Sequence, residues 1–253
     1  MSIQAVAVVI PACDEEALLP SALRAVRTAG AHPDLGPVRL AIVVVADSCS
    51  DHTARVAREA GATVVTVSCR NPGRARSAGV ARALLELGAP TVPAWIATTD
   101  ADSEVPPHWL THQLARAAEG WEAVVGTVSL PPASPLTSVH QVRYESSRPP
   151  VGAWDHPHVH GANLGLTAEA YVSVGGFPPL GAGEDHALVT ALRRAGHRVL
   201  ATDACPVLTS ARLKGRAGGG FADHLTRLAA PGIPANADGS PAGHVRARGG
   251  RRA

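Results

Sequence analysis

Short apolar runs rich in Val, Ile and Ala alternate with helical patterns in the first part of the chain. The four runs span 6–10, 40–45, 63–67 and 94–98. Helical patterns begin near Glu15, after Asp51, which can cap a helix, and near Gly73. Apolar strands separated by helices are typical of a parallel sheet with both faces covered. The sequence therefore predicts an α/β fold with a mostly parallel central sheet and right-handed crossovers.

The pattern becomes less regular after about Pro106. Further helices and strands are expected at 107–119, 123–130, 138–147, 183–195 and 197–200. Residues 231–253 contain few large apolar side chains and many Gly, Pro, Ala and Arg. Because such a segment cannot offset its ordering entropy, we expect a disordered basic tail. Residues 1–230 are expected to form one domain, whose two halves meet near residue 105.

Composition disfavours several classes of protein. A net charge of +2 is too close to neutral to predict a nucleic-acid partner. No apolar run approaches the ~20 residues that span a bilayer, and no signal peptide is visible. The cysteines are too widely spaced for a dithiol redox motif or a zinc knuckle: Cys13, Cys49, Cys69 and Cys205. A cytoplasmic protein with free thiols is expected.

Polar residues follow each of the first four predicted strands. The loops are Pro11-Ala-Cys-Asp-Glu15, Asp47-Ser-Cys-Ser-Asp51, Asn71-Pro-Gly-Arg-Ala-Arg76 and Asp100-Ala-Asp102. Any one of them is more simply explained as a turn or a helix cap. Four together predict a ligand site, because ligands of open parallel sheets bind beyond the carboxyl ends of the strands. The Asp100 and Asp102 carboxylates suit a hard divalent cation that holds a diphosphate.

The ordered series of motifs resembles family 2 glycosyltransferases with the GT-A fold. The matching segments are 8–15, 45–53, 71–74, 100–102, 161–165, 175–177 and 183–185. The resemblance runs from about Val6 to Leu200 and is nearest to small soluble bacterial enzymes. It implies transfer of a sugar from a nucleoside-diphosphate sugar. One departure is Ala46, which stands where many relatives have the first Asp of an Asp-Asp pair.

The resemblance implies that the first half binds the nucleotide. Asp47, with the backbone of Pro11 and Ala12, would recognise the base. A carboxylate can accept a hydrogen bond from N3–H of uracil, which makes a UDP-sugar the expected donor. Glu15 could assist in this recognition.

The resemblance also implies how the diphosphate is held. Arg74, with Arg76 as a second candidate, would pair with the phosphate oxygens. Asp102 would ligate Mg²⁺ or Mn²⁺, and Asp100 would bind the ribose or the metal through water. The cation would neutralise the leaving nucleoside diphosphate.

A late histidine, which many GT-A enzymes use as a third metal ligand, is missing from 207–216. Ser210, Arg212 or Arg216 could serve the diphosphate instead, or the metal could be held weakly. His224 is a more distant candidate.

The second half is expected to shape the acceptor pocket. Asp185 is the candidate general base, and the resemblance implies inversion at the anomeric carbon without a covalent intermediate. His160, Asn163 and Glu184 are expected to bind the acceptor or the sugar. The alternative for Glu184 and Asp185 is an acidic first turn that complements a helix dipole.

The histidine-rich stretch 155–160 also allows a zinc site, since alternating histidines on a strand share a face. No companion cysteine accompanies it, so an acceptor-site loop is preferred. Trp154 beside it could stack on an acceptor ring or pack in the protein.

Other functions fit the motifs less well. A sugar-phosphate nucleotidyltransferase would open with a Gly-rich loop and an Arg after the first strand. A dinucleotide-binding protein would need Gly-x-Gly-x-x-Gly there. A catalytically inactive nucleotide-binding homologue remains an alternative, against which the retention of Arg74, Asp100, Asp102 and Asp185 argues.

Overall fold

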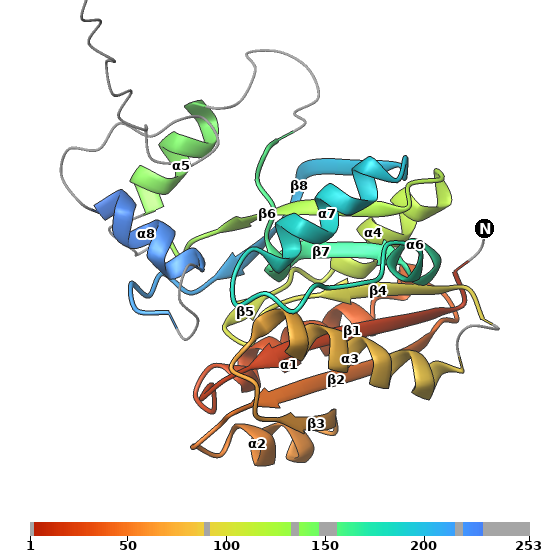
Figure 1. Ribbon diagram of the computed structural model, residues 1–253, viewed down its shortest axis with the longest axis horizontal. Coiled ribbons are helices and arrows are strands. Elements are labelled where there is room, and N and C mark those ends of the chain that lie inside the picture. Colours follow the sequence, from red (N-terminus) through yellow and green to blue (C-terminus); the bar gives the residue numbers. More distant parts are fainter. Residues whose placement is uncertain (1–2, 89–91, 133–136, 147–155, 216–219, 230–253) are drawn as a thin grey trace, which may run out of the picture.

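The computed structural model describes residues 3–88, 92–132, 137–146, 156–215 and 220–229. Its centre is an eight-stranded sheet in the order β3-β2-β1-β4-β7-β6-β8-β5 (Figure 1). The strands are β1 (Ala5–Ala12), β2 (Arg39–Asp47), β3 (Thr63–Val67), β4 (Ala94–Thr98), β5 (Ser103–Glu104), β6 (Ala123–Ser129), β7 (Leu164–Thr167) and β8 (Val199–Thr209).

Helices cover the sheet on both sides, as the sequence predicts. The α-helices are α1 (Leu19–Gly30), α2 (Thr53–Glu59), α3 (Pro72–Leu87), α4 (Trp109–Ala118), α5 (Thr137–Ser146), α6 (Ala168–Ser173), α7 (Glu184–Arg194) and α8 (Phe221–Ala229). Two short 3₁₀ turns are η1 (Pro33–Leu35) and η2 (Gly161–Asn163).

The sheet is parallel in its first half and mixed in its second. β1 lies between β2 and β4 and pairs in parallel with both, while β3 pairs in parallel with β2. β7 then runs antiparallel to β4 and β6, and β5 runs antiparallel to β8. β6 and β8 are parallel. The prediction of a mostly parallel α/β sheet is confirmed, with antiparallel pairings introduced by two short strands.

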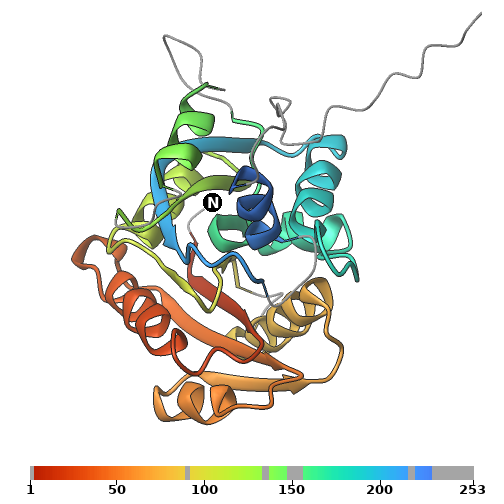
Figure 2. The same ribbon diagram turned by 90° about the vertical axis from the view of Figure 1, so that its left-hand side faces the viewer.

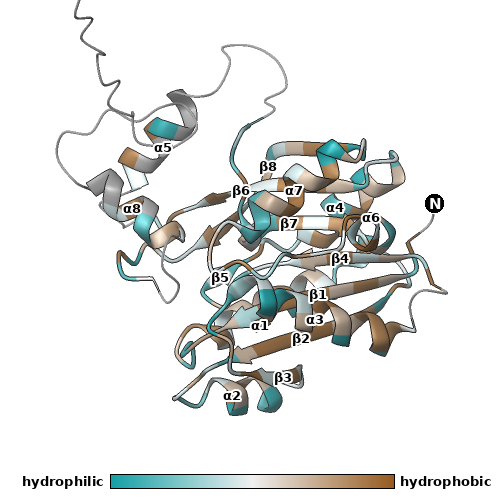
Figure 3. Cartoon of the chain, in the orientation of Figure 1, coloured by the Kyte–Doolittle hydropathy of each residue, from teal (hydrophilic) through white to brown (hydrophobic). Residues whose placement is uncertain are grey.

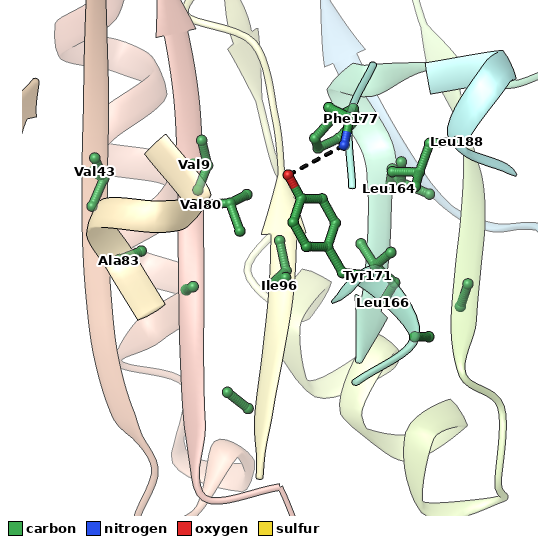
Figure 4. Packing of buried hydrophobic residues seen from close by; sticks show 14 of the residues in the cluster. Val9, Val43, Val80, Ala83, Ile96, Leu164, Leu166, Tyr171, Phe177 and Leu188 are labelled. Carbon is green, nitrogen blue, oxygen red and sulfur yellow. Dashed lines mark hydrogen bonds between the residues drawn. The ribbon is translucent and has the colours of Figure 1, made fainter. Parts of the chain in front are cut away.

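Two hydrophobic cores lie on opposite faces of the sheet. Neighbouring residues of β1 alternate between them: Val9 packs with α3, α6 and α7, and Val8 packs with α1, α2 and α4. Both faces are therefore apolar, which explains the continuous hydrophobic runs along β1 and β2 in Figure 3. Figure 4 shows the first core, where the Tyr171 hydroxyl accepts a hydrogen bond from the Phe177 amide at 3.2 Å.

Most predicted elements are present, and the errors cluster in the second half. The predicted strand at 197–200 is only the beginning of β8, whose apolar run is interrupted by Asp203 and Pro206. β5 and β7 were not predicted because they are only a few residues long. The cap of α2 is His52 rather than Asp51, whose carboxylate accepts a hydrogen bond from the Thr53 amide at 2.9 Å.

Several predictions fall outside the described residues. They concern the 231–253 tail, Trp154, Asp155 and Arg216, and the side chain of His224. Within the described part of the chain, no helix is long and apolar enough to cross a membrane.

Candidate active site

A cavity of about 650 Å³ opens at the carboxyl ends of β1, β2 and β4. The loops after these strands line it, together with the segment 157–162 and the start of α7. Figure 2 looks toward this edge of the sheet, where α8 lies in front of the strands. Its first residues, Phe221 and Ala222, also line the cavity. The four polar loops predicted from the sequence therefore share one site.

Three non-glycine residues that line the cavity have positive φ angles: Asp14 at 52°, Ser48 at 56° and Arg70 at 44°. Each follows a different strand, β1, β2 or β3. Such conformations cost energy outside glycine and persist where neighbouring contacts enforce them, often at functional sites. At Asp14 the enforcing contact is its carboxylate, which accepts a hydrogen bond from the Ser50 amide at 2.6 Å.

Asp47 anchors the loop that precedes α3. Its carboxylate accepts hydrogen bonds from the amides of Cys69, Arg70 and Asn71 at 2.8, 2.9 and 2.9 Å. Burial alone would raise the pKa of Asp47, but these amides outweigh it and the pKa is lowered. Asp47 lines the cavity, yet much of its acceptor capacity already serves the backbone.

Arg76 connects the two halves of the site. It is 5% exposed, and its guanidinium pairs with Asp100 at 2.5 Å and with Glu184. A β-carbon added at Gly161 would meet this guanidinium, so a larger residue there would require Arg76 to shift. Burial, with Asp185 adjacent, raises the pKa of Glu184 despite its partner Arg76. Arg76 thus joins the Asp-x-Asp loop to the first turn of α7.

Asp185 is held at the cavity wall by two backbone amides. Its Oδ2 accepts a hydrogen bond from the Gly161 amide at 2.7 Å, and its Oδ1 accepts one from the His186 amide at 2.8 Å. The residue that begins this turn, Gly183, has a φ of 74°, which favours glycine. Asp185 is therefore oriented by the backbone and faces the same cavity as the Asp-x-Asp loop.

Asp102 shares an arginine with Glu15. Arg212 approaches Glu15 at 2.6 Å and Asp102 at 3.0 Å. Burial and the neighbouring charge of Asp100 raise the pKa of Asp102 to about 6, with Glu15 adding to the effect and Arg212 opposing it. One guanidinium therefore serves two carboxylates that are mostly withdrawn from water.

The cavity carries an excess of negative charge. Seven carboxylates and three arginines line it among the described residues, a formal net charge of −4 with the histidines neutral. A diphosphate would be repelled from such a surface unless cations accompanied it. The hard oxygens of Asp100 and Asp102 are the ligands that Mg²⁺ and Mn²⁺ prefer. The residues therefore fit a divalent cation, although no third side-chain ligand joins this pair in the described structure.

A model of glycosyl transferase family 2 matches residues 7–173 of the chain. The chain belongs to glycosyl transferase family 2. The match includes all four loops after the first strands and the Gly161 segment. No curated protein sequence matches the chain.

Solved glycosyltransferases share the fold of this family 2 member. S. aureus TarS has a TM-score of 0.61 at 14% identity, covering 82% of this chain and 37% of TarS. The mannosyltransferase PcManGT from Pyrobaculum calidifontis, in complex with GDP-Man and Mn²⁺, has a TM-score of 0.61 at 21% identity, covering 84% of this chain and 58% of PcManGT.

Glucosyl-3-phosphoglycerate synthase from Mycobacterium tuberculosis is a third such structure. Its complex with Mn²⁺, UDP-glucose and phosphoglyceric acid has a TM-score of 0.55 at 18% identity, covering 89% of this chain and 78% of the synthase. The chain spans less than two thirds of the length of TarS and PcManGT. These likenesses confirm the predicted GT-A fold.

Two predicted site residues lie away from the cavity lining. The Arg74 side chain is exposed, and its amide donates at 2.9 Å to the side chain of Asn71, which caps α3. Asn163 is 3% exposed, accepts a hydrogen bond from Trp109 Nε1 at 2.9 Å and donates to the carbonyls of Thr127 and Cys205. The Asn163 side chain therefore hydrogen-bonds within the protein interior, and we propose no ligand contact for it.

The histidine segment, predicted to be an acceptor-site loop, lines the cavity. His158 and His160 line the cavity with ring centroids 6.3 Å apart, and His160 lies edge-on to Phe221 at 5.4 Å. In the described part of the chain, the histidines belong to no group of potential metal ligands. This disfavours the zinc alternative.

Sequence reasoning missed two features of the site. One is Arg70, which lines the cavity and lies directly before the recognised Asn71 motif. The other is the contact of Arg212 with Glu15, although Arg212 itself was named as a candidate for the diphosphate. No local sequence signal reveals a contact across that much of the chain.

Proposed function

We propose that this family 2 member is an inverting, metal-dependent glycosyltransferase that moves a sugar from a nucleoside-diphosphate sugar to an acceptor hydroxyl. The observation that carries the proposal is that the Asp-x-Asp loop and Asp185 line one cavity. Donor and acceptor could therefore meet between a diphosphate site and a carboxylate base. PcManGT and the glucosyl synthase, both seen with a nucleotide-sugar and Mn²⁺, support the donor class.

The donor nucleotide is proposed to bind along the loops after β1 and β2. Pro11 and Ala12 line the cavity there and offer backbone groups to the base, which we propose to be uracil. Asp47 and Glu15 line the same cavity. Asp14 and Ser48, whose φ angles are positive, add polar groups to the cavity lining at these loops.

The diphosphate is proposed to lie between the Asp-x-Asp loop and the cavity's arginines. Asp102 and Asp100 would hold Mg²⁺ or Mn²⁺, which when bound neutralises charge on the leaving nucleoside diphosphate. Arg70 and Arg212 face the same cavity and can each present a guanidinium fork to phosphate oxygens. Asp100 also remains tied to Arg76, which fixes its orientation.

Asp185 is the proposed general base. Its two amide contacts hold the carboxylate in place and leave it on the cavity wall. It would take the proton of the acceptor hydroxyl as that oxygen attacks the anomeric carbon and the nucleoside diphosphate departs. Direct displacement inverts the anomeric centre. Glu184 and His160, on the same wall, would contact the sugar or the acceptor.

Asp185→Asn separates transfer from donor binding. We expect kcat for release of nucleoside diphosphate to fall about 10³-fold, since a positioned base contributes on that order. The rise in melting temperature caused by UDP or GDP with Mn²⁺ should be unchanged. Asp34→Asn, which alters an exposed carboxylate outside the cavity, is the matched control. Full turnover by Asp185→Asn would refute the base role, and nucleotide binding without turnover by the unmodified protein would favour an inactive homologue.

A further inference from the structure

Arg212 occupies the carboxylate that a donor-site metal needs. Its guanidinium approaches Asp102 Oδ2 at 3.0 Å and Glu15 Oε1 at 2.6 Å. The Asp102 side chain is 12% exposed and that of Glu15 is 5% exposed, whereas that of Arg212 is 28% exposed. The arginine therefore covers both carboxylates and keeps one side toward the cavity.

The sheet register delivers Arg212 to this position. β5 and β8 pair antiparallel with Ser103 opposite Thr209, and the Ser103 hydroxyl donates to Thr209 Oγ1 at 2.8 Å. Asp102 directly precedes Ser103, and Arg212 follows Thr209 by three residues. The Arg212 amide also donates to Ser210 Oγ at 3.3 Å. The contact is thus built into the fold by strand pairing.

Arg212 and a divalent cation compete at Asp102. Arg212 pairs with Oδ2 of this carboxylate, and the like charges of a guanidinium and a metal ion repel strongly at contact distance in a partly buried site. Asp100 is also partly compensated, because its Oδ1 pairs with Arg76 at 2.5 Å. Without a donor, a metal ion must therefore compete with an arginine that neutralises two carboxylates.

A nucleoside diphosphate removes this conflict. Phosphate oxygens are strong partners for a guanidinium fork and can draw Arg212 away from Asp102. The side chain already faces the cavity, so its guanidinium needs only to change partners. The carboxylates it leaves are then uncompensated charges, which favours binding of another cation there.

We propose that Arg212 is an exchangeable cation at the donor site: it holds Asp102 and Glu15 in the free protein and moves to the diphosphate when the metal takes Asp102. This rests on the proposed function, because it requires a donor diphosphate and a metal at Asp102. The free protein then binds Mn²⁺ weakly. On the protein, nucleotide and Mn²⁺ each strengthen the binding of the other, by more than their affinity for each other in solution accounts for. The coupling is reciprocal, as linkage requires.

Titration of the full-length protein with Mn²⁺ alone, and with Mn²⁺ in the presence of UDP or GDP, tests this exchange. Free Mn²⁺ is followed by its electron paramagnetic resonance signal. In Arg212→Gln, the Kd for Mn²⁺ alone should fall on the order of tenfold. Arg70→Gln is the matched control, because it removes the same charge from the same cavity without touching Asp102. It should tighten Mn²⁺ binding about twofold at most, the part due to net charge.

Arg212→Lys guards against a folding defect in the first variant. Lysine keeps the charge but lacks the fork that reaches both carboxylates, so its Kd for Mn²⁺ should lie between those of the unmodified protein and Arg212→Gln. Equal Mn²⁺ affinity in the unmodified protein, Arg212→Gln and Arg70→Gln, with nucleotide-dependent Mn²⁺ binding intact, would overturn the exchange alone. Failure of every protein to bind Mn²⁺ even with nucleotide would overturn the metal proposal and the exchange with it.

Discussion

The two halves of the site position their charged groups in different ways. On the nucleotide side, Asp14 and Asp47 are held by amides of loops that follow strands in the parallel part of the sheet. On the acceptor side and between the halves, the fixed contacts join distant segments: Arg76 to Glu184, and Arg212 to Glu15. The contacts of the first set, which we call the local framework, span 22 to 36 residues, whereas Arg76 and Glu184 are 108 residues apart. The contact of Asp185 with the Gly161 amide spans 24 residues and is of the first kind.

This difference has a physical basis in the sheet. Parallel strands end at one edge, so successive loops meet there without further contacts. The antiparallel strands β5 and β7 reverse that direction, and their neighbours are set by long connections. A buried ion pair between such distant segments stabilises the fold, because removal of one partner leaves an uncompensated buried charge.

Arg76→Met should have the largest effect on stability. It leaves the Glu184 and Asp100 carboxylates without their common partner, and Glu184 is buried. Breaking a buried ion pair on one side costs about 3–5 kcal/mol of unfolding free energy. Urea denaturation followed by circular dichroism measures this loss. Arg82→Met, which removes an exposed helix arginine, is the control and should cost less than about 1 kcal/mol. Equal losses in both variants would show that the Arg76 contacts do not hold the halves together.

Asp47→Asn tests the local framework through pH. The pKa of Asp47 is lowered in the folded protein, so its ionised form favours folding above its ordinary value of 3.8. This stabilisation is lost as the pH falls through the lowered folded pKa. As the pH falls below 3.8 and through the lowered folded pKa of Asp47, the unmodified protein should therefore lose stability more steeply than Asp47→Asn. Parallel profiles of melting temperature against pH in the two proteins would contradict the anchoring role.

A comparison of Arg70→Ala with Arg74→Ala has the smallest expected effect. Arg70 lines the cavity, whereas the Arg74 side chain is exposed and outside its lining. Loss of one charge-assisted phosphate contact should weaken UDP or GDP binding by about tenfold in Arg70→Ala. Arg74→Ala should change it by about twofold at most, through long-range charge alone. Calorimetric titration distinguishes the two; the reverse order would restore the diphosphate role predicted for Arg74 from its motif.

The sequence predicted the first half of the fold because each buried strand carries its own signal. The runs at 6–10 and 40–45 are apolar on both faces, and polar loops follow them directly. Asp100 and Asp102 could be placed at the cavity for the same reason.

The second half could not be predicted to the same depth, because its decisive contacts are not local. Asn163 belongs to a motif that suggested ligand binding, yet its side chain hydrogen-bonds to Trp109 and two backbone carbonyls inside the protein. Arg76 could be read as a phosphate ligand, and only the fold shows that Glu184 reaches it. Motif spacing predicts which residues gather, but side-chain pairing requires the three-dimensional arrangement.

We propose that the Asp-x-Asp loop binds a nucleoside diphosphate through a divalent cation. The most direct measurement of this binding is the melting temperature with UDP or GDP, with and without Mn²⁺, in the unmodified protein and in Asp102→Asn. At saturating ligand we expect a rise of about 5 °C in the unmodified protein that depends on Mn²⁺. The Mn²⁺-dependent part should disappear in Asp102→Asn. A rise that is the same in Asp102→Asn, or no rise with any nucleoside diphosphate, would contradict the account.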